Sequence, residues 1–315
     1  MMYIAGVDIG GTNIKTGIVG LDGRVLKKSS IRTGVERPWE AVADDIAREV
    51  RSLADKLSVP LAQLKGVGVG CPGSINSETG CVDYANNIGW EGVPLSKGLS
   101  DRLGLSVRLC NDANAAALGE ATFGAGRQYR DVVFITLGTG VGGGVIIGGK
   151  LFEGNESKGT ELGHTVIQRG GELCTCGRRG CLEAYASATA LIRDTKVAMR
   201  KNKDSLMWKA APTLNDVSGR TAFDCAKEGD PAAKRVVDEY LEALGEGLCD
   251  FINIFRPEAI ILGGGVCAQG DALLTPLRVF TKNFSYGGEH GPAVELLIAT
   301  LGNDAGLIGA ASLLL

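Results

Sequence analysis

Two stretches of sequence decide the fold: IAGVDIGGTNIKTGIVG at residues 4–20 and VVFITLGTGVGGGVIIGG at residues 132–149. Each has apolar residues, many of them β-branched, on both sides of a short glycine turn, which is typical of two strands joined by a tight hairpin. When the stretches are aligned from their first residues, Gly10 meets Gly138 and the same pattern recurs. This internal repeat predicts two related α/β domains that each begin with the same unit.

Hydrophobic periodicity and turn residues predict the other elements. Asn111 or Asp112 stands directly before an alanine-rich run, where a short polar side chain caps a helix. The alternation of helices and strands indicates an α/β protein. We expect helices at 38–57, 94–103, 231–255, 271–282 and from about 303 onward, and strands at 66–70, 105–109, 259–262 and 294–298.

The composition excludes several classes of protein. Glycine accounts for 47 of the 315 residues, about twice the usual share, but no Gly-X-Y period indicates collagen. Hydrophobic residues make up 44% of the chain, too many for a disordered protein, and the length suits two domains. Because the net charge of −3 offers no general field for nucleic acid or an anionic membrane surface, we expect neither partner.

We expect neither a leader sequence nor a membrane span. The few residues before Asp8 contain no basic segment and no long apolar core, unlike a signal peptide. The uncharged run at residues 132–149 approaches the length of a spanning helix, but its many glycine and β-branched residues favour buried strands. The nine cysteines are an odd number, which argues against a closed disulfide framework. We therefore expect a cytoplasmic protein.

Three glycine clusters each follow an apolar strand and have the chemistry of a phosphate site. Glycine lets the backbone approach a ligand closely, and successive N–H groups that point inward form an anion-binding nest. Thr12 and Thr139 add hydroxyl donors, Asp8 could hold Mg²⁺ through water, and Lys15 could add positive charge. The alternative is that the turns only form tight hairpins, since none matches a P-loop. The clusters are Gly10-Gly11-Thr12, Gly138-Thr139-Gly140 and Gly263-Gly264-Gly265.

The sequence CTCGRRGC at residues 174–181 is the strongest local signal. Its thiols, Cys174, Cys176 and Cys181, can surround one tetrahedral ion, and His164 upstream would complete a Cys₃His zinc set. The alternatives are a buried or redox-active group of cysteines and a hydrogen-bonded loop histidine. With all four positions filled by protein, the zinc would be structural rather than a site for activating water. The second nitrogen of the imidazole would stay available to donate to a substrate hydroxyl.

Taken together, these motifs resemble the ROK family of sugar kinases, repressors and related open reading frames. They occur in the family's order along nearly the whole chain, and the sequence is most similar to the bacterial glucokinases within that family. The matching pieces are DIGGT (8–12), NNIGW (86–90), NDANAAALGE (111–120), LGTGVGGG (137–144), ELGH (161–164), CTCGRRGCLE (174–183), ILGGGV (261–266) and LGNDAGLIGAA (301–311).

The resemblance implies the actin-like ATPase fold, also called ribonuclease H-like, with two related α/β domains around a central cleft. On this basis we expect a smaller domain at 1–115, joined by the C-terminal helix at 303–315, and a larger domain at 116–302 that carries the zinc loop. The implied reaction is transfer of the γ-phosphate of Mg·ATP to the 6-hydroxyl of glucose. The family's members commonly form homodimers or homotetramers, so we expect a homo-oligomer.

The resemblance also implies roles for particular residues. Asp112 would be the catalytic base, although on the sequence alone it could be no more than a helix cap. The sugar hydroxyls would contact Gly73, Asn87, Asn111, Asp112, Glu161, His164 and Glu183. The phosphates and nucleoside of ATP would contact Asp8, Gly10, Gly11, Thr12, Lys15, Gly138, Thr139, Gly140, Gly264 and Gly265. Zinc would be held by His164, Cys174, Cys176 and Cys181.

Other functions remain open at this stage. The enzyme could phosphorylate another hexose, such as N-acetylmannosamine, N-acetylglucosamine, fructose or allose, and its donor could be ADP or polyphosphate. The family's sugar-sensing repressors carry a DNA-binding segment before the DIGGT-like turn, and we expect none here because the turn begins at Asp8. A non-catalytic sugar-binding protein is the remaining alternative.

Overall fold

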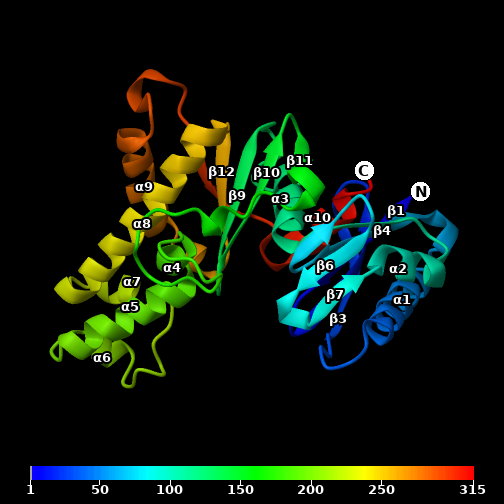
Figure 1. Cartoon of the computed structure of the whole chain (residues 1–315), viewed down its shortest axis with the longest axis horizontal. Helices are drawn as coiled ribbons and strands as arrows, with labels where there is room; N and C mark the ends of the chain where they lie inside the picture. Colours follow the sequence, from blue (N-terminus) through cyan, green and yellow to red (C-terminus); the bar gives the residue numbers. More distant parts are fainter. Residues whose placement is uncertain (1) are drawn as a thin grey trace. The chain divides into compact units, whose positions relative to one another are not determined.

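The N-terminal part of the chain forms the first of two five-stranded β-sheets (Figure 1). The structure is a computed structural model that describes residues 2–315. The strands of the first sheet lie in the order β3-β2-β1-β4-β8. The first three strands form an antiparallel meander, and β4 and β8 extend the sheet in parallel from β1. These strands are β1 (Tyr3–Ile9), β2 (Asn13–Gly20), β3 (Val25–Arg32), β4 (Leu64–Cys71) and β8 (Val107–Asn111).

The second five-stranded sheet repeats this topology. Its order is β11-β10-β9-β12-β13, so in both sheets the third, second, first, fourth and fifth strands lie side by side. The shared order is what the internal repeat in the sequence predicts. The strands are β9 (Val132–Leu137), β10 (Val141–Ile147), β11 (Lys150–Phe152), β12 (Ala259–Gly263) and β13 (Glu295–Ile298).

A small third sheet was not expected from the sequence. It consists of β5 (Ser74–Asn76), β6 (Cys81–Ala85) and β7 (Trp90–Val93), which pair antiparallel in that order. The buried side chains of Ile75 and Val82 join the core beneath the first sheet, so this sheet extends that core rather than forming one of its own.

The helices that the sequence predicts lie close to their expected ranges, but no helix was expected at 207–210 or at 221–227. The longest, α8, begins after Asp230, whose side chain accepts a hydrogen bond from Ala233 N at 2.8 Å, and has proline at its first position. Every helix within residues 2–315 is too short or too polar to cross a membrane. The helices are α1 (Trp39–Lys56), α2 (Leu95–Leu103), α3 (Asp112–Thr122), α4 (Glu183–Ala186), α5 (Ala188–Lys201), α6 (Met207–Ala210), α7 (Thr221–Lys227), α8 (Pro231–Phe255), α9 (Asp271–Phe284) and α10 (Ala305–Ser312).

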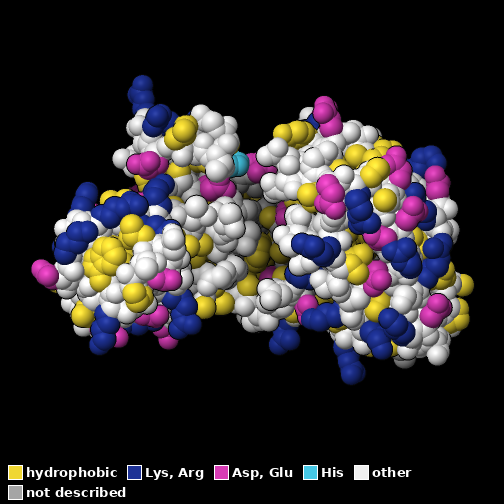
Figure 2. Space-filling model, turned by 90° about the horizontal axis from the view of Figure 1, so that it is seen from below, with side chains coloured by type: hydrophobic (Ala, Val, Ile, Leu, Met, Phe, Trp, Pro, Cys, Tyr) yellow, Lys and Arg dark blue, Asp and Glu magenta, His cyan; other side chains and the backbone are white. Residues whose placement is uncertain are grey.

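The surface carries both signs of charge. On the face displayed in Figure 2, Lys and Arg side chains lie among Asp and Glu side chains, with no large area of a single sign. The similar numbers of the two types, 33 basic and 36 acidic residues, agree with this distribution. The view therefore shows no extended basic surface on this face.

The chain divides into two compact units. One comprises Met1–Phe134, Gly144–Thr160 and Ala299–Leu315, and the other comprises Ile135–Gly143 and Glu161–Ile298. This division differs from the domain boundaries expected at residues 115 and 303. The reason is packing: α3 lies against α10, and Leu151 of β11 packs on a cluster that joins these two helices, so all three elements belong to the first unit.

Helix α10 packs unusually closely on the first sheet because glycine faces it there. A β-carbon built on Gly68 of β4 would lie 1.7 Å from the carbonyl oxygen of Ala310, and one on Gly6 of β1 would lie 2.3 Å from that of Leu307. Contacts this short cannot exist, so a side chain at either position would force the helix away from the sheet.

We predict that Gly68→Ala destabilises the protein by about 3 kcal/mol or more, because the added methyl group meets a helix backbone that cannot rotate aside. Urea unfolding followed by circular dichroism measures the change as a lower midpoint. Gly219→Ala is the matched control, since a β-carbon there would meet no atom within 4 Å. Equal midpoints for the two variants would contradict this account of the packing.

Candidate functional site

The first glycine turn, Gly10 to Thr12, joins β1 to β2. It is closed by a hydrogen bond from Gly10 N to Asn13 O at 2.9 Å, and Gly11 and Thr12 are exposed. A β-carbon built on Gly11 would lie 3.6 Å from the carbonyl oxygen of Asn87, so the short 3₁₀ helix η2 (Asn86–Ile88) adjoins the turn. A segment expected to contact ATP and one expected to contact the sugar are therefore neighbours in the structure.

Lys15 follows this turn in β2, and its ammonium group contacts two oxygen atoms of the protein. Its Nζ is 3.3 Å from Asp8 Oδ2 and donates to the carbonyl oxygen of Asn303 at 3.0 Å. The carboxyl group of Asp8 also lies close to the start of α10, where a β-carbon built on Gly306 would be 3.0 Å from Asp8 Cγ. Asp8 and Lys15 are thus an ion pair in this structure, and the charge of Lys15 is partly compensated within the protein.

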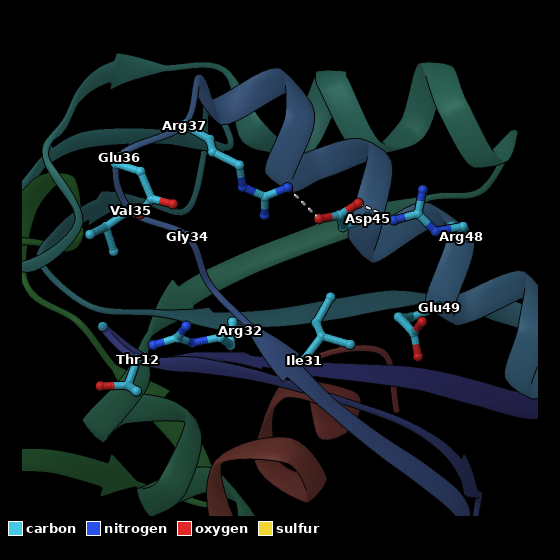
Figure 3. Close-up of a pocket in the computed structure, with 11 residues that line it drawn as sticks. Thr12, Ile31, Arg32, Gly34, Val35, Glu36, Arg37, Asp45, Arg48 and Glu49 are labelled. Carbon is cyan, nitrogen blue, oxygen red and sulfur yellow. Dashed lines mark hydrogen bonds and ion pairs between the residues drawn. The ribbon is translucent and has the colours of Figure 1, made fainter.

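A cavity of about 560 Å³ opens beside the turn (Figure 3). Within it, Arg37 Nη1 lies 2.8 Å from Asp45 Oδ2, and Arg48 also binds Asp45. Burial acts to raise the pKa of Asp45, but the hydrogen bonds and charges of the two arginines outweigh it, so the pKa lies below its ordinary value. Arg32 is the third arginine of the cavity and has no ion pair with any residue from 2 to 315. Gly11 and Thr12 of the first glycine cluster line the cavity, whereas its three arginines belong to no motif of the sequence.

Asp112 is the first residue of α3, but Asn111 is the residue that caps the helix. Asn111 Oδ1 accepts from Ala113 N at 2.8 Å and from Asn114 N at 3.3 Å, while its Nδ2 donates to Gly73 O at 3.1 Å. The carboxylate of Asp112 accepts from Ala113 N at 2.9 Å through Oδ1. Because Asn111 supplies the cap, Asp112 is not required for that role.

The backbone conformation and the surroundings of residue 73 both require glycine. Its φ is +96°, and a β-carbon there would lie 2.2 Å from the carbonyl oxygen of Tyr84. The resulting close approach brings the carbonyl of Gly73 to the Asn111 side chain. Gly73, Asn111 and Asp112, which the sequence assigned to one sugar site, are therefore neighbours.

In the second unit, the turn Gly138 to Gly140 joins β9 to β10 and lies against Glu183. The carboxylate oxygen Oε2 of Glu183 accepts from Val141 N at 3.1 Å, and a β-carbon on Gly140 would lie 2.4 Å from that oxygen. Gly264, with φ of +90°, lies so close to the end of β9 that a β-carbon would be 2.4 Å from Leu137 O. The second and third glycine clusters are thus adjacent, as a shared nucleotide site requires.

The same carboxylate reaches the cysteine cluster. Glu183 Oε1 accepts a hydrogen bond from Thr175 Oγ1 at 2.7 Å and one from Cys174 Sγ at 3.4 Å. Glu161 lies just before the 3₁₀ helix η4 (Leu162–His164), and its carbonyl accepts from His164 N at 3.0 Å. His164 and Glu183 therefore contact the cluster of thiols, and Glu161 is joined to it through its backbone bond to His164.

The ligand atoms of His164, Cys174, Cys176 and Cys181 all lie within 4.8 Å of one another. Cys176 Sγ is 3.7 Å from Cys181 Sγ, close to the roughly 3.8 Å that separates two sulfurs 2.3 Å from a shared tetrahedral ion. His164 Nδ1 is 3.5 Å from Cys174 Sγ. Residue types, number and spacing all fit a closed zinc site.

The protonation tendencies of the three thiols differ. Burial raises the pKa of Cys181 to about 12 and also raises that of Cys174, whereas hydrogen bonds, led by the one from the Arg178 backbone, lower the pKa of Cys176. The thiolate, not the thiol, is the form of cysteine that binds a metal. The turn around Arg178 thus favours the charged form that a metal needs.

Comparisons with known proteins place the chain among relatives along its whole length. The ROK family model matches residues 4–315. The glucokinase of Thermotoga maritima is 41% identical over 317 aligned residues, which cover 99% of this chain and 97% of that protein.

Solved structures are similar along the same length. A ROK family glucokinase from Streptomyces griseus, in complex with glucose and AMPPNP, has a TM-score of 0.82 and 38% identity, with coverage of 99% of this chain and 98% of that one. A ROK family transcriptional regulator, a homologue of the E. coli MLC protein, has a TM-score of 0.86 and 25% identity, with coverage of 99% and 78%.

Proposed function

Because the chain belongs to the ROK family, we propose that it is a glucokinase, which transfers the γ-phosphate of ATP to the 6-hydroxyl of glucose. The full-length similarity to glucokinases carries this conclusion, and the fold is the actin-like ATPase fold expected from the sequence motifs. The regulator with a similar fold has lower sequence identity, so a sugar-sensing role without catalysis is the weaker reading. A kinase for another hexose is the main alternative within the same chemistry.

Asp112 is the proposed general base. A sugar hydroxyl is a poor nucleophile until its proton has an acceptor, and a carboxylate within hydrogen-bond reach typically contributes about 10²–10⁴-fold to the rate. The position of Asp112 supports this role, because it directly follows Asn111, whose side chain binds the carbonyl of Gly73, another proposed sugar contact. The bond from Ala113 N to Asp112 Oδ1 orients the carboxylate.

The remaining polar residues of the motifs are proposed to orient the sugar. A carboxylate offers about four lone-pair sites, so Glu183 can accept sugar hydroxyls while it binds Val141 N and Thr175. Leaving such a buried group unpaired disfavours analogues that lack the hydroxyl, which gives selectivity. The proposed sugar ligands are Gly73, Asn87, Asn111, Asp112, Glu161, His164 and Glu183.

Phosphoryl transfer relies on positioning and on stabilisation of charge. We assign the triphosphate and nucleoside to the three glycine clusters, with Asp8 as the residue that would hold Mg²⁺ through water. Mg²⁺ would neutralise charge on the phosphates. The proposed contacts to ATP are Asp8, Gly10, Gly11, Thr12, Lys15, Gly138, Thr139, Gly140, Gly264 and Gly265.

We assign a structural zinc ion to His164, Cys174, Cys176 and Cys181. A bound ion would fix the loop that carries these residues, and its closed coordination leaves no position for activating water. Because Nδ1 is the imidazole nitrogen near Cys174 Sγ, Nε2 is the nitrogen available to donate to a sugar hydroxyl. We further propose that the protein is cytoplasmic and forms a homodimer or homotetramer.

The substrate assignment is tested with a kinase panel. We expect the highest kcat/KM with glucose and ATP among glucose, fructose, allose, N-acetylglucosamine and N-acetylmannosamine, each combined with ATP, ADP or polyphosphate. A coupled assay follows the donor that has lost one phosphate, such as ADP, and mass spectrometry follows the sugar phosphate. Preference for another hexose by more than tenfold would replace glucose, and no transfer with any pair would refute the kinase assignment.

Asp112→Asn should bind glucose nearly as wild type but lose turnover by about 10²-fold or more, because the amide cannot accept the hydroxyl proton. Calorimetry gives the affinity for glucose, and the coupled assay gives kcat. Asp271→Asn is the matched control, since Asp271 is also the first residue of a helix, α9. Turnover within tenfold of wild type would remove Asp112 from the catalytic role.

Metal analysis by mass spectrometry should find about one zinc ion per chain, and Cys176→Ser should abolish it. Cys81→Ser is the matched control, because Cys81 is also a free cysteine but lies in β6, outside the cluster. We expect the metal-free variant to melt at lower temperature, since a structural ion stabilises the loop it binds. Full zinc content in Cys176→Ser would exclude the proposed ligand set.

A further inference from the structure

Thr33, the first residue after β3, holds the glycine turn of the first unit from one side. Its side chain is buried, with 1% exposed, and its Oγ1 donates to the carbonyl oxygen of Gly10 at 2.6 Å. Its backbone N–H donates to the carbonyl oxygen of Thr12 at 2.9 Å. One residue thus binds the first and last carbonyl groups of the turn.

This arrangement leaves the N–H groups of the turn for a ligand. Those of Gly11 and Thr12 have no acceptor in the part of the chain that the structure describes, and both residues are exposed. Successive backbone N–H groups that point the same way bind anions such as phosphate. The Gly11 N–H shares a planar peptide with the Gly10 carbonyl, so the bond from Thr33 Oγ1 fixes its direction, and the second bond from Thr33 holds the other end of the turn at the Thr12 carbonyl.

Thr33 is itself fixed to helix α1. Arg37 Nη2 donates to the carbonyl oxygen of Thr33 at 3.1 Å, and Arg37 Nη1 pairs with Asp45 of α1 (Figure 3). Arg48 also binds Asp45, so the carboxylate that holds Arg37 has two cationic partners. A chain of contacts therefore runs from α1 through Arg37 and Thr33 to the turn.

We propose that Thr33 is a positioning residue for the phosphate donor: it holds Gly10 and Thr12 so that the N–H groups between them face a phosphate of ATP. The inference rests on the proposed kinase function, and it adds a residue outside every motif of the sequence. Loss of the hydroxyl would leave the Gly10 carbonyl unpaired and let the turn rotate, which weakens its contacts to phosphate but not those to sugar.

The test compares Thr33→Val, Thr33→Ser and Thr195→Val. Thr195 is the matched control, because it is fully buried and its Oγ1 donates to the carbonyl oxygen of Leu191 at 2.7 Å, inside α5. We expect Thr33→Val to raise KM for ATP about tenfold, the effect of one lost hydrogen bond, while KM for glucose stays within about twofold. Thr33→Ser keeps the hydroxyl and should restore most of the affinity for ATP.

Two results would overturn the proposal: equal KM values for ATP in Thr33→Val and Thr195→Val, or a parallel rise of both KM values in Thr33→Val. Should Thr33→Val fail to fold, Thr33→Cys takes its place, because a thiol is a weak donor of similar size. If wild type shows no turnover, the proposed function fails, and calorimetric binding of Mg·ATP to the same variants still decides whether Thr33 positions the phosphate.

Discussion

The close contact between α3 and α10 is the constraint on which the first unit depends. A β-carbon on Gly309 of α10 would lie 1.6 Å from the carbonyl oxygen of Ala115, and one on Gly119 of α3 would lie 2.5 Å from that of Ala305. The two helix backbones therefore touch, with glycine on both sides. Since α3 begins at Asp112, the depth at which α10 packs also sets the position of the proposed catalytic carboxylate.

A buried carboxylate reinforces that contact. Glu120 of α3 is 0% exposed and accepts from Leu301 N at 2.7 Å, Thr300 N at 3.1 Å and Ala125 N at 2.9 Å. A buried charge is tolerated only when such donors replace water, so the segment before α10 is held where these bonds require. Part of the glycine surplus thus has a cause that the sequence did not suggest, helices that pack without side chains between them, besides the turns that are proposed to face ligands.

Local features could be predicted from the sequence, whereas contacts between distant segments could not. Helix α8 has the bounds expected from its periodicity and its proline, and the spacing of the thiols and His164 identified the cluster, because each depends on neighbouring residues. The small sheet of β5, β6 and β7 was missed because its strands are short and carry no strong alternation. The Asp8–Lys15 pair and the Thr33 contacts were missed because only the folded sheet brings those groups together.

In the second unit, Glu183 explains why a structural metal would matter to a phosphoryl-transfer site. One oxygen of its carboxylate binds Thr175 and Cys174 in the cysteine loop, and the other binds Val141 N directly after the turn Gly138 to Gly140. A carboxylate is rigid and planar, so a displacement of the loop moves the oxygen that holds the turn. An ion that ordered the cysteines would therefore also order the proposed phosphate-binding N–H groups without contacting the reacting atoms. The cysteine loop and the glycine turn are thus joined through a single side chain, that of Glu183.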